Sequence, residues 1–185
     1  PKGATWAEPA KFIDDVYYRS DGGGYTQKGF SQLFSIDANG GNAKQLTDDE
    51  FDNAGDVSFS NDGKSLYFSA NRHTNNQLKF TNNEIYKLDL ASQTITEITK
   101  RDGPDEQPKV SPDGRYLAYT GYDDKRTNYE NAQLYIRDLK TGNTTSLTPN
   151  FDRSVGQIKW SANSKGVYFS YADKGQTALA YQPRS

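Results

Sequence analysis

The chain has 185 residues, with 22 basic and 24 acidic side chains and a formal net charge of −2. This balance excludes the basic stripe of a nucleic-acid-binding protein and the polybasic segment of a membrane-surface protein, so we expect neither nucleic acid nor a membrane as a partner. The absence of cysteine excludes a disulfide framework and thiolate chemistry.

The sequence repeats itself about every 50 residues, and this period predicts the architecture. Segments rich in aromatic residues start at Val16, Leu66, Leu117 and Val167, which lie 50, 51 and 50 positions apart. A second series keeps the same period, with steps of 52 and 49: Leu46-Thr47, Ile98-Thr99 and Leu147-Thr148.

Four repeats follow one another along the chain, at residues 10–48, 56–99, 107–148 and 157–182. Each of the first three contains four short runs rich in Val, Ile, Tyr, Phe and Thr, and the last contains three. Gly, Pro, Asn and Asp bound these runs, which indicates strands rather than helices. The turns Asn61-Asp62-Gly63 and Pro112-Asp113-Gly114 suit tight reversals with positive φ.

A four-stranded antiparallel unit of this length is typical of a β-propeller blade, so we predict an all-β protein with a single propeller region over residues 1–185. Closed propellers have about four to eight complete blades. Three complete blades and one incomplete blade therefore favour an open arc, part of a longer protein, and the lack of methionine agrees. In the alternative, residues 1–9 supply the missing outer strand and close a minimal four-blade ring.

An open arc leaves aromatic sheet faces uncovered at both ends, and such faces drive association. We therefore expect self-association. The candidate residues are Tyr168 and Tyr181 at the C-terminal end and Trp6 and Phe12 at the N-terminal end.

Blade geometry places the tight turns on one face and the long loops on the other. The long-loop face collects residues 21–31, 72–83 and 123–131, together with the links between blades at 48–56, 100–107 and 149–156. Long loops on a rigid scaffold are where binding residues concentrate.

The residues on this face point to binding rather than catalysis. His73 is the only histidine, which excludes a histidine-cluster metal site, and Gly-x-Ser-x-Gly does not occur. We interpret His73 as an exposed loop residue, the glycines at 22–24 as a flexible loop and the acidic residues at 48–52 as a solvated link. We therefore predict no catalytic residue, no metal and no cofactor in this chain.

Several stretches resemble one known propeller: Val16-Tyr17-Tyr18-Arg19-Ser20-Asp21-Gly22-Gly23-Gly24-Tyr25, Phe68-Ser69-Ala70-Asn71-Arg72, Glu84-Ile85-Tyr86, Ser111-Pro112-Asp113-Gly114, Thr120-Gly121-Tyr122-Asp123-Asp124 and Asp152-Arg153-Ser154. It is the N-terminal propeller of prolyl oligopeptidase-type serine peptidases, in the acylaminoacyl-peptidase and dipeptidyl aminopeptidase branch. The likeness covers most of the chain. Ser-Pro-Asp-Gly by itself is shared with TolB-like and other propellers and is weakly specific.

The resemblance implies that the chain is the non-catalytic propeller of a serine peptidase. Such a propeller gates peptide access and helps to position substrate for a C-terminal α/β-hydrolase domain, which this sequence does not contain. From loop position alone, we choose Arg126, Tyr129, Glu130 and Arg153 as candidates that face substrate or the hydrolase domain.

Two other functions remain open. A TolB-like protein-interaction propeller would have a complete ring, and a propeller glycosidase would need an isolated pair of carboxylates near its axis. The first residues carry no hydrophobic signal core, which leaves a cytoplasmic or a periplasmic location open.

Overall fold

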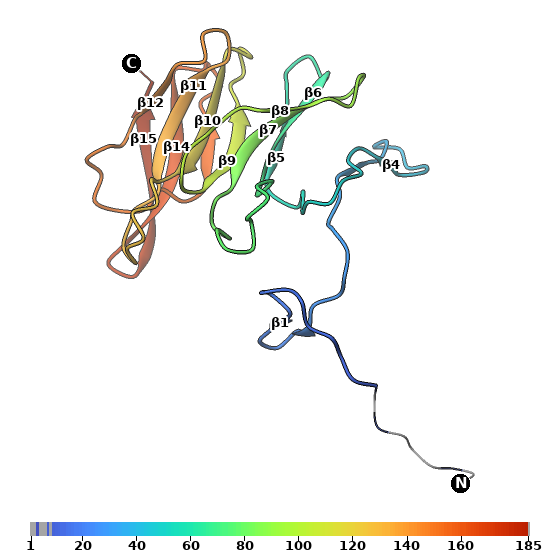
Figure 1. Ribbon diagram of the computed structural model, residues 1–185. Helices are drawn as coiled ribbons and strands as arrows, with labels where there is room; N and C mark the ends of the chain where they lie inside the picture. The colour runs from blue at the N-terminus through green and yellow to red at the C-terminus, as the bar shows by residue number, and fades with distance from the viewer. Residues whose placement is uncertain (1–2, 4–6, 8, 185) are drawn as a thin grey trace.

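The computed structural model describes residues 3, 7 and 9–184, which form an arc of sheets preceded by an extended N-terminal segment (Figure 1). The described residues contain fifteen strands and no helix, so the all-β prediction is confirmed. None of these residues forms a helix that could cross a membrane. The strands are β1 (Arg19–Ser20), β2 (Gly24–Tyr25), β3 (Phe34–Ser35), β4 (Lys44–Gln45), β5 (Val57–Phe59), β6 (Ser65–Ala70), β7 (Glu84–Asp89), β8 (Ile95–Glu97), β9 (Asp105–Val110), β10 (Tyr116–Gly121), β11 (Gln133–Asp138), β12 (Thr144–Ser146), β13 (Ile158–Trp160), β14 (Gly166–Asp173) and β15 (Gln176–Pro183).

Three antiparallel sheets form the body of the arc. Their strand orders are β5-β6-β7-β8, β9-β10-β11-β12 and β13-β14-β15, each following the chain order. The register repeats with the sequence, since Phe68 pairs with Tyr86, Tyr119 with Tyr135 and Phe169 with Ala180.

A serine and an acid or amide two residues later fix the turn between the first and second strands of each sheet. The hydroxyls of Ser60, Ser111 and Ser161 donate to Asp62, Asp113 and Asn163 and accept the N–H of the residue that starts the next strand. These bonds replace strand pairing where the chain reverses. The Ser-x-Asp-Gly signature is therefore a local folding signal.

The Leu/Ile-Thr series has an equally local function. Three buried threonine hydroxyls accept backbone N–H groups of the third strand of the same repeat: Thr47 from Leu33 at 2.9 Å, Thr99 from Ile85 at 2.9 Å and Thr148 from Leu134 at 2.8 Å. Each bond extends the edge pairing beyond the short fourth strand. The threonine thereby satisfies a donor that would otherwise be buried without a partner.

Apolar side chains pack between successive sheets rather than within one central core. Tyr67 and Ile85 of the β5–β8 sheet meet Leu117 and Tyr119 of the next sheet. Between the second and third sheets lies the largest cluster: Tyr116, Ala118, Leu134, Ile136, Val155, Ile158, Trp160, Val167 and Phe169. Each sheet therefore depends on a neighbour to bury its faces.

Residues 10–48 differ from the four-stranded blade expected there. They hold two separate two-stranded pieces, β1-β2 and β3-β4, of which β3-β4 lies beside the β5–β8 sheet (Figure 1). Val16, Tyr17 and Tyr18 are 57%, 48% and 44% exposed. A two-stranded hairpin with no sheet face against it is marginally stable, which explains the difference.

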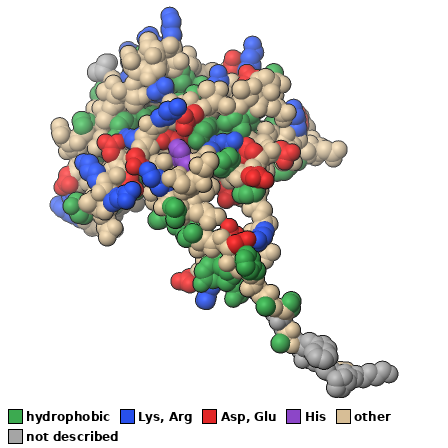
Figure 2. Space-filling model, in the orientation of Figure 1, with side chains coloured by type: hydrophobic (Ala, Val, Ile, Leu, Met, Phe, Trp, Pro, Cys, Tyr) green, Lys and Arg blue, Asp and Glu red, His purple; other side chains and the backbone are tan. Residues whose placement is uncertain are grey.

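The expected ring closure by residues 1–9 and the candidate Trp6 lie largely outside the described residues. The described part of the N-terminal segment runs away from the arc, and β1 lies apart from the sheets, below them in Figure 1. Apolar side chains gather on this segment below the sheets (Figure 2). The candidate Phe12 is 85% exposed.

Candidate functional site

A hollow on the long-loop face lies between the β10–β11 loop and the link from β12 to β13. We call it the loop pocket, and its volume is about 560 Å³. Its walls are acidic and aromatic: Tyr122, Asp123, Lys125, Thr127, Tyr129, Glu130, Asn131, Gln133, Tyr135, Pro149, Asn150, Phe151 and Asp152. This combination suits a cationic group, because carboxylates attract it and ring faces accommodate it.

Two of the four residues chosen from the sequence line the loop pocket. Tyr129 is 82% exposed, and Glu130 accepts hydrogen bonds from the hydroxyl and N–H of Thr127. Arg126 adopts a φ of 58° and donates its N–H to Asp124 at 2.7 Å, outside the pocket lining.

Arg153 also lies outside that lining. It contacts Asp152 at 3.2 Å and Asp173 at 3.9 Å, and both ion pairs are well exposed to solvent. The structure thus brings Tyr129 and Glu130 together in one wall, while Arg126 and Arg153 lie at its margin.

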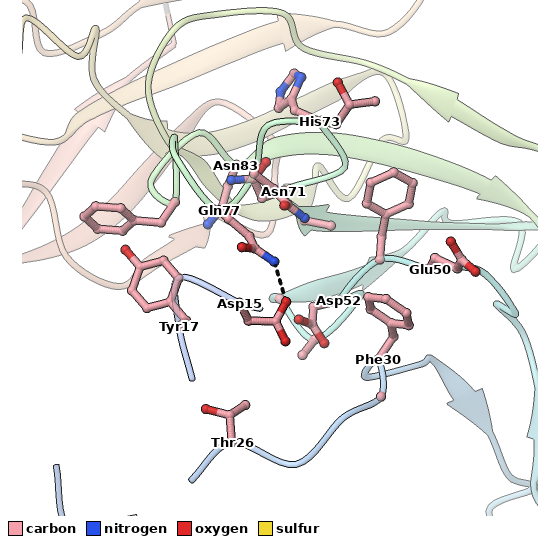
Figure 3. Close-up of a pocket in the computed structure, with 18 of the residues that line it drawn as sticks. Asp15, Tyr17, Thr26, Phe30, Glu50, Asp52, Asn71, His73, Gln77 and Asn83 are labelled. Atoms are coloured by element: carbon pink, nitrogen blue, oxygen red, sulfur yellow. Dashed lines mark hydrogen bonds between the residues drawn. The ribbon is translucent and has the colours of Figure 1, made fainter. Parts of the chain in front are cut away.

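A second hollow, the N-terminal pocket, separates the N-terminal segment from the β6–β7 loop and has a volume of about 920 Å³. Figure 3 shows Asp15 and Tyr17 of that segment facing Gln77 and Asn83 of the loop. The Gln77 amide donates to Asp15 at 2.9 Å, which joins the two walls. None of the four residues chosen from the sequence lines this pocket.

His73 is less exposed than expected. It is half-buried in the β6–β7 loop, and its Nε2 is enclosed without a hydrogen-bond partner among the described residues. The ring reaches the surface among charged side chains (Figure 2). The described residues contain no group of three His, Cys, Asp or Glu side chains placed to hold a metal ion.

The acidic link at 48–52 is more ordered than the solvated segment expected from the sequence. Asp49 pairs with Arg72 at 2.8 Å, and Arg72 also donates to Asn53, which is completely buried. The Arg72 guanidinium lies over the rings of Phe51 and Tyr86, at 4.9 and 5.4 Å. This link therefore fixes the junction before the β5–β8 sheet.

Sequence reasoning missed a buried ionic network between the first two large sheets. Arg101 forms an ion pair with Asp105, which is 1% exposed, and its guanidinium lies 4.2 Å from the Tyr135 ring centroid. Glu84 is equally buried and accepts the hydroxyl of Thr99 and the N–H of Arg101, the latter at 2.7 Å.

The network borders the loop pocket and holds part of its wall. Tyr135 lines the pocket, and Asp123, another lining residue, lies 3.6 Å from Nε of Arg101. The one sequence signal for this packing was Gly121 at the end of β10. A Cβ there would clash with Arg101, Pro104 and Asp105, and glycine in a strand marks such a close approach.

Burial changes the acidity of both carboxyl groups. Desolvation raises the pKa of Glu84 from 4.5 to about 7, although the bonds from Thr99 and Arg101 oppose the shift. Desolvation likewise raises the pKa of Asp105 from 3.8 to about 6, against the attraction of Arg101. The folded protein therefore favours neutral Glu84 more strongly than the unfolded chain does.

We expect Glu84→Gln to gain stability relative to wild type as the pH rises from 5 to 8. Because the folded pKa of Glu84 is raised, its ionisation reduces stability as the pH climbs from about 4.5 through about 7, by up to about 3 kcal/mol in total. Glutamine does not ionise, so the variant does not lose this stability as the pH rises. Urea unfolding at several pH values measures the difference between variant and wild type.

The matched control is Glu50→Gln, since Glu50 is exposed. Its stability should follow the wild-type pH profile. A difference between Glu84→Gln and wild type that stays constant from pH 5 to pH 8 would contradict the expectation.

Comparison with known proteins places these features in a family. The model of the dipeptidyl peptidase IV (DPP IV) N-terminal region matches residues 24–129, more than half of the chain. The chain belongs to this family. The match includes β2 to β10 and most of the β10–β11 loop, which carries Tyr129.

Relatives of this DPP IV N-terminal region support the assignment. A dipeptidyl-peptidase 5 from Porphyromonas gingivalis is 34% identical over 128 residues, which cover 67% of this chain and 18% of that protein. A dipeptidyl-peptidase 5 from Aspergillus fumigatus is 29% identical over 144 residues, covering 72% of this chain and 20% of that protein. The chain thus spans about a fifth of the length of these relatives.

Two solved structures show the same fold. TolB from Acinetobacter baumannii has a TM-score of 0.64 and 26% identity, over 82% of this chain and 35% of that one. An acylaminoacyl peptidase in complex with Z-Gly-Gly-Phe-chloromethyl ketone has a TM-score of 0.66 and 18% identity, over 95% of this chain and 26% of that one. The predicted propeller fold and the resemblance to the N-terminal propeller of prolyl oligopeptidase-type peptidases are confirmed.

Proposed function

We propose that this chain is a non-catalytic propeller segment of a serine peptidase, which gates peptide access and helps to position substrate for a hydrolase domain elsewhere in the parent protein. Membership of the DPP IV N-terminal region family and the dipeptidyl-peptidase 5 relatives support the parent activity. The single histidine and the lack of Gly-x-Ser-x-Gly support a non-catalytic role for this segment.

The loop pocket is the observation that carries the positioning role. Asp123, Glu130 and Asp152 surround an open hollow whose other walls include Tyr129 and Phe151. A peptide with a free amino terminus offers one positive charge and an apolar side chain close together. The pocket brings carboxylates and rings together, so we infer that it takes a short peptide entering amino end first.

We expect the chain to bind a short, fluorescently labelled peptide with a free amino terminus and to leave it intact. Glu130→Gln should weaken binding about tenfold, because a charge-assisted hydrogen bond to the ammonium group becomes a bond to a neutral amide. Fluorescence anisotropy measures the affinity, and mass spectrometry of the recovered peptide measures cleavage.

Two controls define the site. The same peptide with an acetylated amino terminus should bind about as weakly as the free peptide binds Glu130→Gln. Glu50→Gln, whose carboxylate lines the N-terminal pocket instead, should bind like wild type. Equal binding of both peptides, or cleavage abolished by a serine-directed phosphonate, would contradict the proposed role.

A TolB-like interaction propeller is the second candidate function. The TolB structure from Acinetobacter baumannii supports it, since its identity of 26% exceeds that of the acylaminoacyl peptidase. The gene downstream of Ser185 separates the two functions. A Gly-x-Ser-x-Gly elbow followed by Asp and His favours the peptidase, and its absence favours the interaction propeller.

A further inference from the structure

Arg101 lies between two carboxylates of very different exposure. Its Nη2 atom pairs with Asp105, whose side chain is 1% exposed, and its Nε atom lies 3.6 Å from Oδ1 of Asp123, whose side chain is 66% exposed. Asp105 belongs to β9, in a complete four-stranded sheet, and Asp123 lines the loop pocket. One guanidinium group therefore connects a buried charge to the wall of the pocket.

The contact between Arg101 and Asp123 is incomplete. The Nε atom of Arg101 is buried without a hydrogen-bond partner among the described residues, and 3.6 Å is too long for a hydrogen bond. A buried N–H group without a partner favours any movement that supplies one. The attraction of Asp105 for the same guanidinium opposes a movement toward Asp123.

The link that carries Arg101 is joined to the pocket wall through the backbone. The N–H of Asp124 donates to the C=O of Asp102 at 2.7 Å. At Gly103 a Cβ would clash with the C=O of Tyr122, so the two segments are in close contact. A change of charge at one carboxylate therefore acts on the guanidinium group, since the backbones on either side of it are held together.

Asp105 is the member of this group whose charge changes close to neutral pH, because desolvation raises its pKa to about 6. Asp105 and Asp123 are the carboxylates that form ion pairs with the Arg101 side chain among the described residues. Other charged and titratable groups face Asp105, Arg101 or Glu84 from every neighbouring element: Glu84 of β7, Glu97 of β8, Lys100 beside Glu97, Tyr119 of β10 and Tyr135 of β11.

We propose that Arg101 couples the protonation of Asp105 to the charge of the loop pocket. When Asp105 is neutral, Arg101 is attracted by Asp123 alone, and the pocket wall becomes less negative. The attraction of the pocket for a cationic group then weakens. By reciprocity, a cation bound in the pocket disfavours the proton on Asp105. That the cation is the amino terminus of a peptide rests on the proposed function.

Carboxyl-carbon NMR of the isotopically labelled chain tests the coupling, because it follows the titration of Asp105 directly. Asp123→Asn should lower the Asp105 midpoint by about 0.5 pH unit, since it removes a like charge and leaves Arg101 to Asp105. In wild type the Nε–H signal of Arg101 should move at the Asp105 midpoint. Asp123 is well exposed, so the substitution removes no buried contact.

Asp152→Asn is the matched control. Asp152 lines the same pocket, but its side chain is 93% exposed and pairs with Arg153. This variant should leave the Asp105 midpoint unchanged. An unchanged midpoint in Asp123→Asn, or equal shifts in the two variants, would overturn the coupling.

The labelled peptide with a free amino terminus separates this inference from the proposed function. A coupling of about 0.5 pH unit corresponds to about a threefold change in affinity, so wild type should bind the peptide about threefold more weakly at pH 5 than at pH 7. The change should be smaller in Asp123→Asn. An equal pH dependence in both proteins would overturn the coupling. Absence of binding at every pH would count against the proposed function alone, because the titration of Asp105 requires no ligand.

Discussion

Replacing Arg101 with methionine is expected to lower the free energy of unfolding by about 3–5 kcal/mol, because it leaves a buried carboxylate without its partner. Arg101 pairs with Asp105, whose side chain is 1% exposed, and stacks on Tyr135. Methionine retains most of the apolar contact of the arginine stem. The loss therefore reports on the charge rather than on packing volume.

Urea unfolding at pH 7 measures this loss. Arg153→Met is the control, since Arg153 is 50% exposed and its partner Asp152 is 93% exposed. An exposed ion pair contributes about 0–1 kcal/mol, so this variant should unfold close to wild type. Equal stabilities of the two variants would contradict a structural role for the buried network.

The effect of Arg101→Met should also depend on pH. Desolvation already raises the pKa of Asp105 to about 6, and loss of Arg101 removes the main opposing attraction. Below about pH 6 the Asp105 carboxyl group is mostly neutral in both proteins, so the loss of the Arg101 charge costs less. The destabilisation should therefore shrink as the pH falls from 7 to 5.

Phe68→Ala is expected to cost about 3–5 kcal/mol, because it opens a cavity in the cluster between the N-terminal repeat and the β5–β8 sheet. Phe68 is fully buried and packs with Leu46, Leu66 and Tyr86, its ring centroid 5.7 Å from that of Tyr86. The lost ring leaves a space that neighbours on rigid strands fill only in part.

Phe12→Ala makes the same chemical change at a residue that is 85% exposed. Its free energy of unfolding in urea should stay within about 0.5 kcal/mol of the wild-type value. If both alanine variants lost the same stability, the interface between β3-β4 and the β5–β8 sheet would not contribute to folding.

The sequence by itself determined the repeat, the strand class and the turns, because these depend on neighbours along the chain. Ser111 bonds to Asp113 two residues away, and Thr99 reaches Ile85 within its own repeat. Such local bonds recur with the 50-residue period. The strands of the three large sheets consequently lie close to where the pattern placed them.

The same local pattern predicted which loops are long, and two of the four residues chosen in them, Tyr129 and Glu130, line the loop pocket. Their loop connects two strands whose positions were already fixed by the repeat. Arg126 and Arg153 lie in similar segments, and nothing in their local sequence distinguishes a side chain that lines a hollow from one at its rim.

Only the tertiary structure decided which residues are buried between sheets. In the sequence, nothing distinguishes Arg101, Asp105 and Glu84 from ordinary charged residues in loops and at strand ends. Packing of one sheet on the next nevertheless removes Glu84 and Asp105 from water. Burial depends on contacts between residues about 50 positions apart in the chain. A periodic sequence pattern is the same in every blade, so it cannot show at which copy of a position the side chain is buried.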